Sequence, residues 1–107
     1  MIFSIGNHIE QIKNGEKVQT RRPTARYRVG GIYSIQPCRT CKGIPEGKIK
    51  IFKRHIECNH FKIGEVDAKE EGGYTPDEFE NLYKSMYPNW EIRYAYVFRF
   101  LSNNSCD

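Results

Sequence analysis

The first part of the chain alternates apolar and polar positions in a way that predicts a short helix followed by an extended segment. Asn7 stands where a helix cap is expected, and two isoleucines share one face of a helix over residues 8–14. Gly15 follows as a stop signal. The chain then continues in extended form to Pro23, which has no backbone donor and is expected to end strand pairing.

Two later stretches predict an antiparallel hairpin. Residues 32–36 place apolar side chains on one side of a strand, and residues 48–57 place Ile49 and Ile51 on one face. The other face of the second stretch carries Lys, Arg and one Phe. Residues 37–47, rich in Pro, Gly and Cys, are expected to form the loop between them.

The second half of the chain predicts two helical segments. Residues 65–71 form a short helical turn that a pair of glycines closes. In the next helix Thr75 is a cap, Pro76 fits the first helical position and Glu78 completes a capping box. Apolar residues recur at helical spacing and predict a stripe that faces the core. They are Phe79, Leu82, Tyr83 and Met86.

A long last strand is predicted over residues 90–101. Tyr and Phe line one side, and the other side carries Ala, Val and Leu together with two arginines. A strand that is apolar on both sides is central in a sheet or part of a barrel. Since the chain has 107 residues and no internal repeat, we expect one α+β domain over residues 1–107.

Charge is distributed unevenly along the chain. Residues 1–62 carry 13 Lys and Arg against 4 Asp and Glu, whereas residues 63–107 carry 4 against 9. A basic half of this density is typical of a protein that binds a polyanion, above all nucleic acid; the alternative is that strands expose Lys and Arg to solvent. We find no apolar run long enough to span a bilayer and no signal peptide, so a cytoplasmic location is expected.

The segment from Gly15 to Pro23 concentrates polar chemistry and is predicted to border a binding site. Lys17 and Thr20 can serve chemistry there, although both reach one face only if the chain turns after Gly15. The electrostatic partners of a phosphate are expected to be Lys17, Arg21, Arg22, Arg26 and Arg28. Tyr27 and Tyr74 are candidates for stacking on a base.

The cysteines raise the question of a metal site. Cys38 and Cys41 have the spacing of half a zinc site, and Cys58 with His60 would supply the other half. A strand over residues 48–57 would hold the two halves roughly 30 Å apart, at about 3.3 Å per residue. We therefore predict no metal, and consider a redox-labile pair or free thiols instead.

Three short motifs carry a resemblance to a known family. They are Gly15-x-Lys17-x-x-Thr20-x-Arg22, Val29-Gly30-x-x-Tyr33 and Asp67-Ala68-x-x-Glu71-Gly72. With the acidic and aromatic helix and the Tyr- and Phe-rich strand that follow, over residues 5–100, the chain resembles an ASCH domain. The resemblance implies a small β-barrel with two or three short helices, similar to the PUA fold of RNA-modifying enzymes. It also implies a cleft in which the Lys17 segment faces the Glu71 segment, and a role in an RNA-related process.

Three functions remain open at this point. The first is binding of RNA or a nucleotide in a basic cleft, by a monomer without a cofactor. The second comes from the resemblance, because some small family members are similar to amidohydrolases of 4-acetylcytidine; the catalytic set would be Lys17, Thr20 and Glu71. The third is a protein–protein adaptor that uses an acidic helix carrying Asp77, Glu78 and Glu80.

Overall fold

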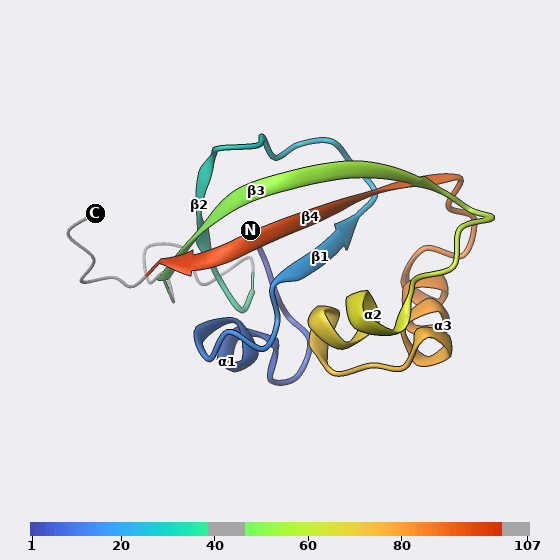
Figure 1. Ribbon diagram of the computed structural model, residues 1–107, viewed down its shortest axis with the longest axis horizontal. Coiled ribbons are helices and arrows are strands. Elements are labelled where there is room, and N and C mark those ends of the chain that lie inside the picture. The colour runs from blue at the N-terminus through green and yellow to red at the C-terminus, as the bar shows by residue number, and fades with distance from the viewer. Residues whose placement is uncertain (39–46, 102–107) are drawn as a thin grey trace.

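The computed structural model describes residues 1–38 and 47–101. These residues form three helices and four strands (Figure 1). In chain order they are α1 (His8–Lys13), β1 (Gln19–Arg22), β2 (Ile32–Ile35), β3 (Gly47–Cys58), α2 (Glu65–Gly72), α3 (Pro76–Met86) and β4 (Ile92–Leu101). The predicted α+β fold class is confirmed, and most of the predicted loop over residues 37–47 lies outside the described residues.

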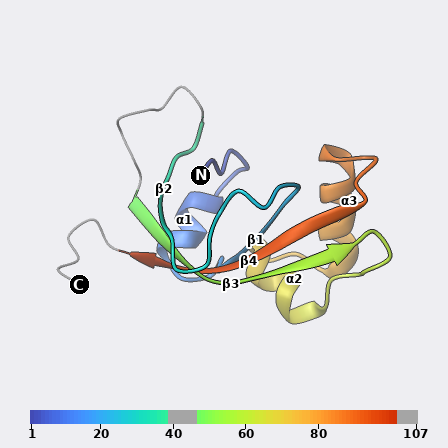
Figure 2. The ribbon, with the colours of Figure 1, turned by 90° about the horizontal axis from the view of Figure 1, so that it is seen from above.

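The strands form one antiparallel sheet in the order β1-β4-β3-β2. β2 and β3 pair as the predicted hairpin, and β4 occupies the central position that its apolar faces predicted. The sheet curls as half a barrel, so that α1 lies at one end and α3 at the other (Figures 1 and 2). None of the helices in the described part of the chain has the length and apolar character needed to cross a bilayer.

A β-bulge interrupts the pairing of the two long strands. Ile51 pairs with Phe98, but the next pair joins Lys53 to Val97, so Phe52 is the extra residue. A bulge redirects the side chain that it carries. Phe52 accordingly remains 43% exposed, while Ile51 is fully buried.

The main core covers one face of the sheet. Alternate residues of β3 and β4 point to this face, and α1 and the N-terminal segment pack against them. The buried members are Phe3, Ile12, Ile35, Ile49, Ile51, Tyr96 and Phe98. A smaller cluster joins α2 to α3 through Ile63, Ala68, Phe79 and Tyr83.

The helix ends agree only in part with the sequence signals. The predicted capping box of α3 is confirmed, because Glu78 N donates to Thr75 Oγ1 at 3.2 Å and Thr75 N donates to Glu78 Oε1 at 2.9 Å. Asn7 precedes α1 as expected, but its side chain makes no capping hydrogen bond, so that part of the prediction was wrong. α2 ends at Gly73 in the left-handed conformation, with φ of +84°.

The apolar stripe predicted for α3 divides into two parts. Phe79 and Tyr83 are buried, as predicted, whereas Leu82 is half-buried and Met86 is 44% exposed. The difference arises because α3 packs on α2 along only part of its surface. Leu82 and Met86 instead form part of the wall of a cleft.

Candidate functional site

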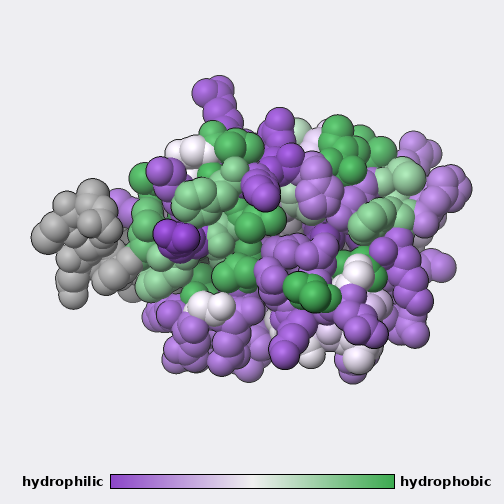
Figure 3. All heavy atoms as spheres, in the orientation of Figure 1, coloured by the Kyte–Doolittle hydropathy of each residue, from purple (hydrophilic) through white to green (hydrophobic). Residues whose placement is uncertain are grey.

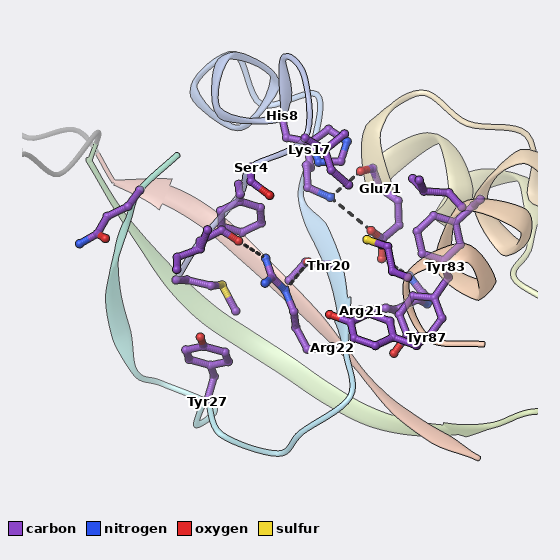
Figure 4. Close-up of a pocket in the computed structure, with 18 of the residues that line it drawn as sticks. Ser4, His8, Lys17, Thr20, Arg21, Arg22, Tyr27, Glu71, Tyr83 and Tyr87 are labelled. Carbon is purple, nitrogen blue, oxygen red and sulfur yellow. Dashed lines mark hydrogen bonds and ion pairs between the residues drawn. The ribbon is translucent and has the colours of Figure 1, made fainter. Parts of the chain in front are cut away.

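A cleft of about 650 Å³ lies between the N-terminal segment, β1 and α3 (Figure 4). Lys17, Thr20, Arg22 and Glu71 line it together with apolar and aromatic side chains. Pockets for small molecules commonly occupy about 300–1,000 Å³ and combine apolar walls with a few polar groups. In size and lining the cleft matches such a pocket.

A turn at the end of α1 brings Lys17 into the same cleft as Thr20. Gly15 has φ of +78°, a conformation that favours glycine, and the backbone N–H of Lys17 donates to the carbonyl of Gln11 at 3.1 Å. Lys17 therefore precedes β1 and escapes strand alternation. The turn on which the shared position of Lys17 and Thr20 depended is present.

Lys17 and Glu71 form a buried ion pair at the wall of the cleft. Lys17 Nζ lies 3.2 Å from Glu71 Oε1, and the two side chains are 2% and 3% exposed. Nζ also donates to the backbone carbonyls of Glu71 and Gln19, so its three N–H groups have three acceptors. Burial lowers the pKa of Lys17, while the charge of Glu71 opposes that shift.

Thr20 is joined to Arg22 rather than to Lys17. Arg22 Nε donates to Thr20 Oγ1 at 3.1 Å, and its Nη2 donates to the carbonyl of Ile2 at 2.7 Å (Figure 4). The guanidinium also lies 4.8 Å from the ring centroid of Phe3. Burial lowers the pKa of Arg22, as expected for a cation held away from water. Arg22 is thus fixed in place beside the only side-chain hydroxyl of β1.

Arg21, predicted to contact phosphate, points instead into a network of carboxylates. Its Nη2 lies 2.9 Å from Glu57 Oε2 and its Nη1 lies 2.8 Å from Glu71 Oε2, with none of the side chain exposed. Nη1 also donates to Gln19 Oε1 at 3.0 Å. Burial disfavours the charged form of Arg21, but hydrogen bonds to Glu57 and the nearby carboxylate charges raise its pKa overall. Arg21 therefore lies at the wall of the cleft and connects β1 to Glu57 of β3 and Glu71 of α2.

The same network continues through Glu57 to Arg93. Arg93 Nε lies 2.8 Å from Glu57 Oε1, and its Nη1 lies 2.8 Å from Glu80 Oε1. The Arg93 guanidinium also lies 4.5 Å from the ring centroid of Trp90. Burial opposes ionisation of Glu57, but the hydrogen bonds from Arg21 and the other partners lower its pKa overall. Three buried cations thus face three carboxylates: Lys17, Arg21 and Arg93 face Glu71, Glu57 and Glu80.

His8 also lines the cleft and has a partner that the sequence did not reveal. Its Nε2 lies 2.8 Å from the hydroxyl of Tyr74, and the side chain is 7% exposed. Burial, with the charges of Lys17 and Arg22, lowers the pKa of His8 to about 4. The imidazole is consequently neutral at pH 7 and shares a hydrogen bond with the hydroxyl of Tyr74, which is not among the residues that line the cleft.

Aromatic rings stand on two sides of the cleft. Tyr27 comes from the β1–β2 connection, and Tyr83 and Tyr87 come from α3 and the residue after it (Figure 4). Tyr27 is half-buried, and its ring is held edge-on by Tyr33, with centroids 4.9 Å apart. The hydroxyl of Tyr83 is buried and has no hydrogen-bond partner in the described part of the chain. Sequence reasoning selected Tyr27 but assigned Tyr83 to the core alone.

The other predicted residues take separate positions. Arg26 is exposed and lines the cleft, whereas Arg28 is exposed but lies outside it. The acidic residues of α3 all have partners within the chain: Asp77 pairs with Lys62, Glu78 completes the capping box and Glu80 holds Arg93. Asp77 nevertheless remains 79% exposed and Glu78 is exposed, so an adaptor surface on this helix stays a prediction.

The described residues include no group of three His, Cys, Asp or Glu side chains arranged to hold a metal ion. Cys58 carries a free, exposed thiol at the end of β3. Cys41 lies outside the described residues, so the zinc site, the redox-labile pair with Cys38 and the free thiols all stay sequence-based alternatives.

No family model matches the sequence, and no curated protein is similar to it in sequence. Solved structures are similar in fold. The ASCH domain from Lactobacillus crispatus JV V101 is 12% identical with a TM-score of 0.75, covering 94% of this chain and 77% of that one. A DUF984 protein from Enterococcus faecalis V583 is 16% identical with a TM-score of 0.69, covering 91% and 68%. At these identities the likeness concerns the fold, and the ASCH fold that the motifs predicted is confirmed.

Proposed function

We propose that the cleft binds a nucleobase, carried either by an unpaired nucleotide of RNA or by a free nucleotide. The observation that carries this proposal is the meeting of aromatic rings, a hydroxyl and arginine side chains in one cleft of about 650 Å³. A nucleobase offers a flat face for stacking and a polar edge for hydrogen bonds, and its phosphate is an anion. The ASCH fold is compatible with such a ligand.

Each wall of the cleft has a role in this proposal. The ring of Tyr27 would stack on the base from one side, with Tyr87 on the side formed by α3 (Figure 4). Thr20 and the immobilised guanidinium of Arg22 would meet the polar edge of the base. Glu71 would shape the cleft indirectly, because its two carboxylate oxygens already hold Lys17 and Arg21.

Phosphate contacts in this proposal come from the exposed arginines. Arg26 borders the cleft and would meet the phosphate of the bound nucleotide, whereas Arg28 would meet a neighbouring phosphate of a longer RNA. Lys17 and Arg21 would contribute through their charge, since their N–H groups are directed to acceptors within the chain.

Calorimetric titration with the four nucleoside monophosphates tests the proposal. We expect Arg26→Gln to weaken binding by about tenfold, the lower end for a hydrogen bond to a charged group. Arg28→Gln is the matched control, since it removes the same charge two residues away and outside the cleft. Equal losses in the two variants, or no binding by the unmodified protein, would refute a nucleotide site in the cleft.

A second function, hydrolysis of a modified nucleoside such as 4-acetylcytidine, is favoured by one observation. Lys17, Thr20 and Glu71 all line the same cleft. In this reaction Lys17, whose pKa burial lowers, would first give a proton to Glu71 and so become a neutral amine. The Thr20 hydroxyl would then attack the acetyl carbonyl carbon and give its proton to Lys17. Glu71 would pass a proton to the departing amine, and water would then cleave the acetyl ester from Thr20.

The hydrogen bonds of Thr20 and Lys17 set the condition for that chemistry. Thr20 Oγ1 receives Arg22 Nε, and Lys17 is held by Glu71 and Gln19, so substrate would have to bring Lys17 and Thr20 together. Incubation with 4-acetylcytidine, followed by chromatography for cytidine and acetate, tests this function. Turnover that Thr20→Val abolishes and Thr20→Ser retains would support it, whereas nucleoside monophosphate binding without any turnover would contradict it.

A further inference from the structure

The face of the sheet opposite the cleft carries a second candidate binding surface. Thr20 and Arg22 point toward the cleft, whereas the residues of β3 and β4 that alternate with the core residues point to this opposite face. One end of this second face is covered by α2, α3 and the buried ion network. The uncovered end carries four cations and one aromatic ring, which we call the basic face: Lys48, Lys50, Phe52, Lys53 and Arg99.

Phe52 occupies the centre of the basic face because of the β-bulge. It lies between residues that pair in register, and 43% of it is exposed. The Arg99 guanidinium lies 5.1 Å from its ring centroid and Lys50 Nζ lies 5.9 Å from it. A groove continues from Phe52 past Val97 to Asp67 of α2. An exposed ring flanked by cations is the arrangement on which a nucleobase stacks while its phosphates are neutralised.

The charges of the basic face are unbalanced. Within residues 1–38 and 47–101, none of its four cations forms an ion pair, although the cations beneath the helices are fully paired. Lys50 and Arg99 even stand directly opposite each other across β3 and β4. Like charges in that position destabilise a sheet. An anionic ligand that bridges the pair would relieve this repulsion.

We propose that the basic face binds single-stranded RNA, with Phe52 stacking on a base and with Lys50 and Arg99 contacting phosphates. This inference extends the proposed function, because it takes RNA as the ligand and adds a contact outside the cleft. Figure 1 views the sheet from this face, and Figure 3 shows apolar side chains set among hydrophilic ones over β3 and β4. The mixture suits a ligand with alternating aromatic and anionic groups better than a wholly apolar partner.

Fluorescence anisotropy with a short labelled single-stranded RNA tests the stacking contact. Phe52→Leu keeps an apolar side chain and removes the ring, whereas Phe52→Trp keeps a ring. We expect Phe52→Leu to weaken RNA binding by about fivefold or more, the lower range for one stacked base, and Phe52→Trp to retain binding. RNA affinity that is equal in Phe52→Leu and the unmodified protein would overturn the proposal and leave the face to an acidic protein segment.

The salt dependence of binding tests the cations independently of Phe52. The double variant Lys50→Gln and Arg99→Gln is expected to reduce the slope of log affinity against log salt by about 1.4, at roughly 0.7 for each phosphate contact to a single strand. The matched control is Lys69→Gln with Lys84→Gln, which removes two exposed charges from α2 and α3. The same slope change in both double variants would overturn the proposed contacts.

Nucleoside monophosphates separate this inference from the proposed cleft function. The basic face is proposed to contact several phosphates of a strand, whereas a monophosphate has one and is proposed to bind in the cleft, so Phe52→Leu is expected to bind it with unchanged affinity. If the unmodified protein binds RNA through Phe52 but binds no monophosphate, the cleft proposal fails and the basic face stands. If monophosphates bind and RNA affinity is insensitive to Phe52 and to the Lys50 and Arg99 charges, the basic face fails and the cleft stands.

Discussion

Glu71 Oε1 lies 3.2 Å from Lys17 Nζ, although 54 residues separate the two in the chain. Its other carboxylate oxygen lies 2.8 Å from Arg21 Nη1. One buried carboxylate therefore connects the last turn of α2 to Lys17, which precedes β1, and to Arg21, which lies within β1. The position of Lys17 in the cleft depends on this bridge, because Glu71 supplies two of its three acceptors.

Replacing Glu71 by Gln is expected to lower the free energy of unfolding by about 3 kcal/mol. The change leaves Lys17 buried with less compensation, and removal of one member of a buried ion pair commonly costs about 3–5 kcal/mol. Gln retains one oxygen as an acceptor, which places the loss at the lower end. Urea denaturation measures it, with Glu91→Gln as the control at an exposed position. A loss below about 1 kcal/mol would show that Lys17 does not need this charge.

The elements that local signals specify were predictable from the sequence. The capping box places the start of α3, and Gly15 turns the chain so that Lys17 reaches the cleft. These signals act over a few residues, so no knowledge of the rest of the fold is required. The motif that contains Glu71 identified the partner of Lys17 only through the resemblance to a family, since no local pattern joins residues so far apart.

The buried ion network could not be read from the sequence. Alternation places Arg21 and Thr20 on opposite faces of β1, but it does not reveal that helices cover the face of Arg21. The contact of Glu57 with Arg93 depends on the register of β3 and β4, which the bulge at Phe52 shifts by one residue. The sequence therefore suggested a phosphate contact for Arg21, whereas the fold supplies carboxylates as its partners.

Stability is expected to fall as the pH drops from about 6.5 to 4, owing to His8. Burial lowers its pKa to about 4, whereas an unfolded chain has a His pKa of about 6.5. In this interval the unfolded state binds the proton and the native state does not, so acid favours unfolding. The contribution is fully present above pH 6.5, and its full size is about 3 kcal/mol.

Urea denaturation of His8→Gln at several pH values between 7.5 and 4 tests the assignment. The variant is expected to lose most of the pH dependence in that interval, because Gln does not titrate. His60→Gln, at an exposed position, is expected to retain it. An unchanged pH profile in His8→Gln would contradict the assignment to His8.

The lowered pKa of Glu57 affects stability in a more acidic range. Its contribution is present above the unfolded pKa of about 4.3 and is lost as the pH falls through the native pKa.

Arg93→Lys is expected to destabilise the fold although it conserves charge. The guanidinium contacts Glu57 through Nε and Glu80 through both Nη atoms, and an ammonium cannot reproduce that planar fork. We expect a loss of about 2–3 kcal/mol, the scale for hydrogen bonds to buried charged groups. Arg99→Lys on the same strand is the control, because Arg99 is exposed, and thermal melting compares the two. Similar melting temperatures for both variants would show that the fork is dispensable.

The ring of Tyr27, rather than its hydroxyl, is expected to determine nucleotide affinity. Tyr27 lines the cleft, and in the described part of the chain its hydroxyl makes no hydrogen bond. Tyr27→Phe should therefore bind nucleoside monophosphates as the unmodified protein does, while Tyr27→Leu should bind them about fivefold or more weakly, because stacking of one base contributes about 1–3 kcal/mol. Calorimetry well below the melting temperature makes the comparison, since Leu also loses the edge-on contact with Tyr33. If Tyr27→Phe and Tyr27→Leu reduced nucleotide affinity equally, the hydroxyl of Tyr27 would be the group that contacts the ligand.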